Sequence, residues 1–169
     1  VISQEPFLKS VFYIALFIGF IPLIILLIQK RAFTKKPIIP FIWLIAFASL
    51  YEFIGTVLLK INTAYWFQIY SLLEFLAIYY FFLQLFKGKY KTLFRILFVL
   101  FVISYSLSFS VWSNKSSLLP LVINQTFISA FVFIFSFRWF ADLFKNLEIQ
   151  NPWLDSTFYF VSGFSIYYS

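Results

Sequence analysis

The stretch from Ile38 to Phe86 reads IIPFIWLIAFASLYEFIGTVLLKINTAYWFQIYSLLEFLAIYYFFLQLF. It divides into two long apolar segments around a short polar break, Lys60–Ala64. Each segment carries one glutamate far from its ends, Glu52 in the word SLYEF and Glu74 in the word SLLEF. Two helices folded back at the break would place each glutamate about 11 residues, or ~16 Å, from the turn. That is about half of a ~30 Å hydrocarbon core, so we expect the two carboxyls near the membrane midplane, at equal depth.

The composition places the whole chain in a membrane. Of its 169 residues, 63% are hydrophobic, 25% are aromatic and only 11% are charged. A soluble domain carries roughly 25% charged residues, and its surface tolerates apolar patches of only a few hundred Å². We therefore predict an integral membrane protein with the lipid bilayer as its main partner. The net charge of +7 lies in short gaps between apolar runs, which indicates topology rather than nucleic-acid binding.

The apolar runs predict a single all-α domain over residues 1–169, a polytopic transmembrane helical bundle. Its six expected spans cover about residues 11–28, 38–59, 64–86, 92–112, 118–140 and 153–169. We expect Pro22 to kink the first span, and Pro37 and Pro40 to open the second. Because the chain begins at Val1 and ends inside an apolar run at Ser169, we expect a fragment whose intact form has seven spans.

Basic residues alternate between the gaps. The first, third and fifth gaps carry four, four and two Lys or Arg residues, whereas the second and fourth gaps carry only Lys60 and Lys115. By the positive-inside rule, the basic gaps lie in the cytoplasm and the N-terminus lies outside. The fifth gap reads as a mixed-charge loop with Arg138, Asp142, Lys145 and Glu148.

The surroundings of Glu52 indicate that its side chain points into the bundle, whereas the face around Glu74 is partly small and partly polar. Small residues mark faces where membrane helices approach closely, and four of them flank Glu52 at helical spacing: Ala48, Ser49, Gly55 and Thr56. No Lys, Arg or His lies at the same depth, and burial disfavours the charged form, so we expect at least one carboxyl to be protonated at neutral pH. The candidate partners or pathway residues are polar side chains on neighbouring spans: Tyr51, Gln68, Tyr70, Asn124 and Gln125.

Two interpretations of the glutamates stay open. In the first, neutral carboxyls only hold helices together by hydrogen bonds. In the second, they form a proton or cation path, or the polar wall of a ligand pocket, because carboxyls inside membranes default to functional hypotheses. Asn124 and Gln125, about two turns below the outer surface, could form the outer mouth of such a pocket.

The residues present exclude most familiar chemistry. The chain has no Cys and no His, and it carries no Gly-rich phosphate loop, zinc signature or nucleophile elbow. We therefore predict no catalytic residue, no metal site and no cofactor. The one enzymatic alternative is intramembrane hydrolysis by the pair of carboxyls, which would need a third group to orient water, and the sequence indicates none.

The run YSLLEF at Tyr70–Phe75, followed by many aromatic residues, and the later segment from Asn151-Pro152-Trp153 to Ile166–Ser169 resemble a group of bacterial multi-pass membrane proteins. The same pattern is similar to the membrane-sensor region of some seven-span histidine kinases. The resemblance implies an inner-membrane bundle that feeds a cytoplasmic signalling domain or partner. We therefore expect a membrane sensor or signalling-input module, with a small ion-coupled transporter using Glu52 and Glu74 as the alternative.

Overall fold

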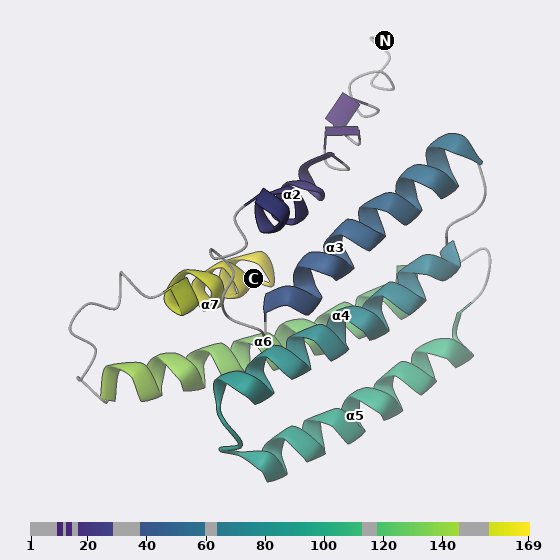
Figure 1. Ribbon diagram of the computed structural model, residues 1–169. Coiled ribbons are helices and arrows are strands. Elements are labelled where there is room, and N and C mark those ends of the chain that lie inside the picture. Colours follow the sequence, from purple (N-terminus) through teal and green to yellow (C-terminus); the bar gives the residue numbers. More distant parts are fainter. Residues whose placement is uncertain are drawn as a thin grey trace, which may run out of the picture. The chain divides into compact units, whose positions relative to one another are not determined.

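The computed structural model describes residues 10–11, 13–14, 17–28, 38–59, 64–112, 118–145 and 156–169. Every regular element in these ranges is a helix (Figure 1). The helices are α2 (Ile21–Ile28), α3 (Ile39–Glu52), the π-helix η2 (Phe53–Leu58), α4 (Ala64–Leu85), α5 (Lys91–Ser110), α6 (Leu118–Lys145) and α7 (Ser156–Tyr167). The prediction of an all-α protein is confirmed for this part of the chain.

Three of these helices are long and apolar enough to cross a membrane: Trp66–Leu85, Lys91–Ser110 and Leu118–Lys145. The helical run Ile39–Gly55 is apolar but shorter. A span of 20 residues is ~30 Å long, which matches the hydrocarbon thickness of a bilayer. Helix composition therefore supports a membrane protein with three candidate spans among the described residues.

The helices divide into two compact units, Val1–Phe81 and Phe82–Ser169, with the boundary inside α4. In the first unit, α2 packs against α3. The expected span 11–28 is not one continuous helix, because a turn at Gly19 and Phe20 precedes α2. Pro22 is the second residue of α2 and does not kink the middle of a helix. Proline is well accommodated in a first turn, where its missing N–H has no helical acceptor.

The expected span 38–59 is helical but changes its hydrogen bonding after Glu52. Pro40 lies in the first turn of α3, as expected, whereas Pro37 lies outside the described residues. At the far end, the Leu59 N–H donates to the Ile54 carbonyl at 2.9 Å, the five-residue spacing of a π-helix. The sequence prediction missed this change from α3 to η2.

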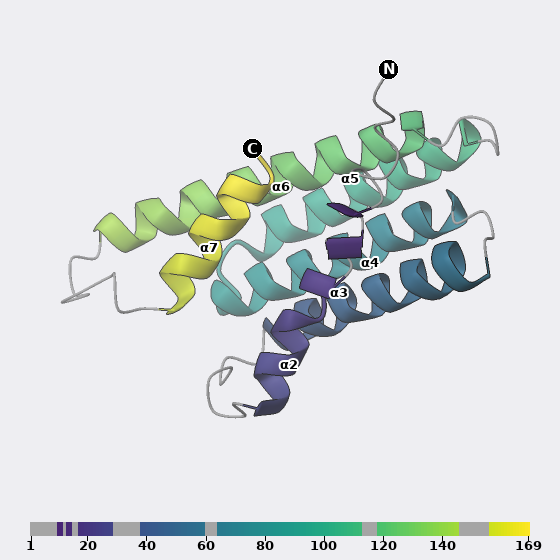
Figure 2. The same ribbon diagram turned by 90° about the horizontal axis from the view of Figure 1, so that it is seen from above.

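In the second unit, α5 and α6 run antiparallel and side by side (Figure 2). Phe94 stacks on Phe135 with ring centroids 4.1 Å apart, and Phe101 contacts Phe127 at 5.5 Å. As residue numbers rise along α5, those of its partners on α6 fall. Aromatic pairs contribute about 0.5–1.5 kcal/mol each beyond burial. Part of the large phenylalanine content therefore forms the core of this unit.

The end of α6 and the start of α7 differ from the expected limits. Helix α6 continues to Lys145, so Arg138 and Asp142 lie on a helix rather than in a loop; Glu148 lies outside the described residues. Helix α7 has 12 residues, ~18 Å, and packs on α6 through Phe140 and Phe158 at 5.9 Å. Of the six expected spans, three correspond to helices long enough to cross a membrane. The other three correspond to shorter helices in the described ranges.

Candidate functional site

One face of α4 buries three polar side chains in its first half. Gln68, Ser71 and Glu74 are 4%, 0% and 3% exposed, and they follow one another at three-residue spacing. The Ser71 hydroxyl donates to the Phe67 carbonyl at 2.8 Å, inside the same helix. Beyond Glu74 the buried face becomes apolar, with Phe75 next along it. We call Gln68, Ser71 and Glu74 the polar stripe of α4.

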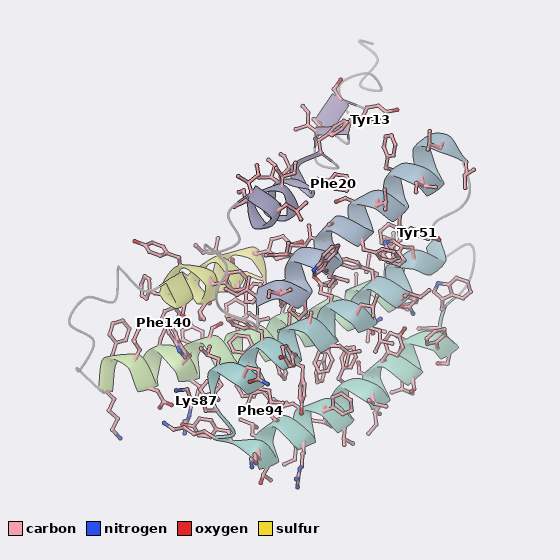
Figure 3. The ribbon with its side chains drawn as sticks, in the orientation of Figure 1. Tyr13, Phe20, Tyr51, Lys87, Phe94 and Phe140 are labelled. Atoms are coloured by element: carbon pink, nitrogen blue, oxygen red, sulfur yellow. The ribbon has the colours of Figure 1, made fainter. Side chains whose placement is uncertain are left out.

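An aromatic group around Trp66 joins α3 to the start of the polar stripe. Trp66 is 5% exposed and stacks on Tyr51 with ring centroids 4.3 Å apart and an interplanar angle of 22°. Figure 3 shows Tyr51 beside the first part of α4. Phe47 meets the Trp66 ring edge-on at 5.5 Å, and Tyr70 lies at 6.1 Å. Aromatic faces of this kind can hold apolar or cationic groups of a ligand.

Glu52 is the last residue of α3, where the helix changes to η2. Its side chain is half-buried, with the Oε1 atom fully enclosed. Ser49 and Gly55, on the small-residue face identified in the sequence, are buried, and Ala48 is half-buried. The inward orientation predicted for Glu52 agrees with this burial. Single-turn π segments inside helices recur at functional sites, so the junction marks Glu52 as a candidate.

The structure offsets the two glutamates along the α3–α4 hairpin. Tyr51, next to Glu52, stacks on Trp66, whereas Glu74 lies eight residues further along α4, a distance of ~12 Å. The prediction that both carboxyls lie at equal depth is therefore wrong. The chain continues for seven residues from Tyr51 to the end of η2, but α4 begins only two residues before Trp66, so the hairpin is asymmetric.

An apolar groove of about 400 Å³ lies between α3 and α4 on the level of Glu74. Its walls are almost wholly apolar: Pro40, Trp43, Leu44, Phe47, Leu73, Leu76, Ala77 and Tyr80. The groove combines earlier residues of α3 with later residues of α4. The stack of Tyr51 on Trp66 shows the same antiparallel pairing of the two helices. The sequence analysis missed the groove, although the four-residue spacing of Trp43 and Phe47 places both rings on one helical face.

The remaining predicted site residues lie in the second unit. Asn124 on α6 is completely buried, and Gln125 is half-buried. The predicted residues thus form two sets: Glu52, Gln68, Tyr70 and Glu74 on the α3–α4 hairpin, and Asn124 and Gln125 on α6. Within the described ranges, no group of three or more His, Cys, Asp or Glu side chains gathers as a metal site would require.

The hairpin gathers several kinds of polar group beside aromatic rings. It combines a carboxyl, an amide and a hydroxyl on one buried helical face with a stacked Trp–Tyr pair at its end. Ligand sites are typically apolar and aromatic with a few placed polar groups, which is the composition found here. No family model matches the chain, and neither curated proteins nor solved structures show a significant match to it. The resemblance to kinase sensor regions therefore stays a prediction.

Proposed function

We propose that this chain contributes six spans to a protein of the bacterial inner membrane that acts as a sensor or signalling-input module. It binds a small or lipid-like ligand at the polar stripe of α4, and it passes the signal to a cytoplasmic domain or partner. The observation that carries the proposal is the burial of Glu74 at 3% exposure, beside Ser71 and Gln68, in a helix long enough to span a membrane. Polar side chains inside a membrane are costly and are commonly functional.

The distribution of basic residues supports an outward-facing site. The turn after α4 carries Lys87, Lys89 and Lys91, which favours a cytoplasmic position for that end of the helix. Trp66 and the polar stripe then occupy the outer half of the membrane. A ligand could reach them from the outside or from the outer leaflet.

Ligand-dependent thermal stabilisation of the purified protein tests this proposal. A ligand present at 100 times its dissociation constant stabilises a protein by about 2.7 kcal/mol, which is readily measured in a panel of lipids and small metabolites. We expect Trp66→Phe and Glu74→Gln to weaken the stabilisation by the ligand found. Trp43→Phe is the matched control, because Trp43 is 55% exposed and lies outside the Trp66 group.

Two outcomes contradict the sensor proposal. The first is an absence of stabilisation across the panel. The second is a loss of binding in Trp43→Phe alone, which assigns the ligand to the apolar groove and not to the polar stripe.

The alternative is a small ion-coupled transporter. Two carboxyls inside apolar helices, ~12 Å apart along one hairpin, favour it, because they could serve as successive positions for a proton or cation. In proteoliposomes, Glu52→Gln or Glu74→Gln should then abolish pH-dependent uptake. Asp142→Asn is the matched control, since Asp142 lies near the end of α6. Normal uptake in both variants, or no uptake by the unmodified protein, excludes this function.

A further inference from the structure

The turn between α4 and α5 is fastened to α6 by Tyr90. The guanidinium carbon of Arg138 lies 4.8 Å from the centre of the Tyr90 ring. The Tyr90 hydroxyl donates to the two carboxylate oxygens of Asp142 over 3.4 and 3.3 Å. The Tyr90 ring also meets Phe86 edge-on, with ring centroids 5.4 Å apart. These contacts lie within the second unit and fix the turn beside the later part of α6.

An open groove of about 470 Å³ lies at this junction, between α5 and α6. Tyr90 and Arg138 form its polar end, and the other lining residues are apolar: Leu93, Ile134, Phe137 and Ala141. Ile134 and Phe137 are 44% and 68% exposed. The groove therefore has an exposed cationic side chain at one end and exposed apolar side chains along its walls.

The turn that carries Tyr90 and the start of α5 are rich in exposed positive charge. Lys87, Lys89 and Lys91 are exposed on the turn, whose position Figure 3 marks by Lys87, and Arg95 is exposed one helical turn further along α5. Among the described residues at this end of α5 and α6, one is acidic, Asp142. Arg138 forms no ion pair with Asp142 within these described ranges, although the two are four residues apart on α6. Arg138 is exposed and forms a side-chain hydrogen bond with Tyr90. Because a guanidinium has five N–H donors, the other donors remain for an anion from outside the protein.

The groove falls where a membrane surface meets these helices. Helix α5 has 20 residues and begins at Lys91, so its ~30 Å length places Lys91 at the edge of the hydrocarbon core. The antiparallel register places Arg138 on α6 at the same level. Leu93 and Ile134 lie further into the apolar region. A molecule in the groove would therefore have its anionic part at the surface and its apolar part among the acyl chains.

We propose that this groove binds an anionic phospholipid of the adjacent leaflet. Its phosphate pairs with Arg138 and is surrounded by the lysines of the turn, and its glycerol and acyl chains lie along Leu93, Ile134 and Phe137. Arginine suits the phosphate because its planar donors bind two oxygens together. Basic pockets between membrane helices recognise lipid head groups by the same chemistry. A free phosphate would leave the apolar walls unused.

Native mass spectrometry of the whole chain in detergent tests the proposal, with phosphatidylglycerol and phosphatidylcholine of equal acyl length as probes. We expect preferential retention of phosphatidylglycerol. Arg138→Gln should weaken its binding about five-fold, since one basic residue near a surface contributes roughly that factor. Arg138→Lys should restore part of the binding. Lys145→Gln, an equal loss of charge on the same helix outside the groove, should retain it.

Four results would overturn the proposal. They are equal retention of the two lipids, unchanged binding in Arg138→Gln, an equal loss in Lys145→Gln, and displacement of the lipid by millimolar glycerol phosphate. The last result would assign the site to a soluble anion. Circular dichroism of each variant verifies that it is folded, and the partial recovery in Arg138→Lys separates loss of charge from loss of structure.

Discussion

Glu74 combines a carboxyl group with almost complete burial on an apolar helix. Glutamine has nearly the same size as glutamic acid and a similar capacity for hydrogen bonds. We expect Glu74→Gln to change the free energy of unfolding by less than about 1 kcal/mol, the scale of hydrogen bonds inside membranes. Glu74→Ala should cost about 2 kcal/mol, because it leaves a cavity. Thermal unfolding in detergent, followed by circular dichroism, measures both changes.

Gln84→Ala provides the control for the Glu74 series. Gln84 is exposed on the same helix, so truncating it should change stability by less than about 0.5 kcal/mol. A loss in Glu74→Gln as large as that in Glu74→Ala contradicts the expectation of a neutral carboxyl. Such a loss would indicate that the folded protein depends on the negative charge of Glu74.

The turn between α4 and α5 depends on backbone conformations that favour glycine. Gly88 has a φ angle of +81°, and a Cβ atom there would lie 3.0 Å from Cε of Lys91. We expect Gly88→Ala to destabilise the protein by about 1–2 kcal/mol, the cost of a left-handed conformation for a residue with a side chain. Lys87, at φ +47°, already bears such a cost.

Lys87→Gly is the matched comparison for Gly88→Ala. Glycine relieves the steric cost at Lys87 but loses about 0.5–1 kcal/mol more conformational entropy on folding, so the two effects nearly cancel. Thermal unfolding should therefore place Lys87→Gly close to the unmodified protein and above Gly88→Ala. The reverse order would show that the turn adopts a different conformation in the folded protein.

Hydropathy predicted the long helices well. The expected limits 64–86 and 92–112 lie within two residues of α4 and α5, because each segment is a continuous apolar run ended by charged or polar residues. It failed at η2, since a π-turn leaves the composition unchanged and alters only which carbonyl accepts each N–H. It also failed at the end of α6, where Arg138 and Asp142 suggested a loop. In the structure their partner is Tyr90, 48 or more residues away along the chain.

Burial of the candidate site was more predictable than its geometry. Helical spacing placed Glu52 on an inward face, because a 3.6-residue period decides which side chains share a face, and its half-buried side chain agrees with this. The spacing gave no clear orientation for Glu74, which is the more deeply buried of the two. It could not give the offset between them. That offset depends on the stacking of Tyr51 on Trp66, a contact that no periodicity reveals. Equal distance from a polar break implies equal depth only when the hairpin is symmetric.

Across the whole molecule, the alternation of basic segments makes a definite prediction about which end of each span faces the cytoplasm. The chain has no cysteine, so a single introduced cysteine is unambiguous. Lys89 and Val111 flank α5 and lie ~30 Å apart along it. In intact cells, a membrane-impermeant maleimide should label Val111→Cys at once and Lys89→Cys only after permeabilisation.

Each labelling pattern has a separate structural consequence. If both cysteines are labelled from the same side, α5 does not cross the membrane, and its exposed apolar side chains must be covered by something other than acyl chains. If the labelling is reversed, α5 crosses but the orientation is inverted. The polar stripe of α4 would then open toward the cytoplasm, and the basic groove at Arg138 would face lipids of the outer leaflet. Only the expected pattern agrees with both proposals, an outward-facing polar stripe and a lipid contact on the cytoplasmic side. Both positions depend on the turn between α4 and α5 lying in the cytoplasm.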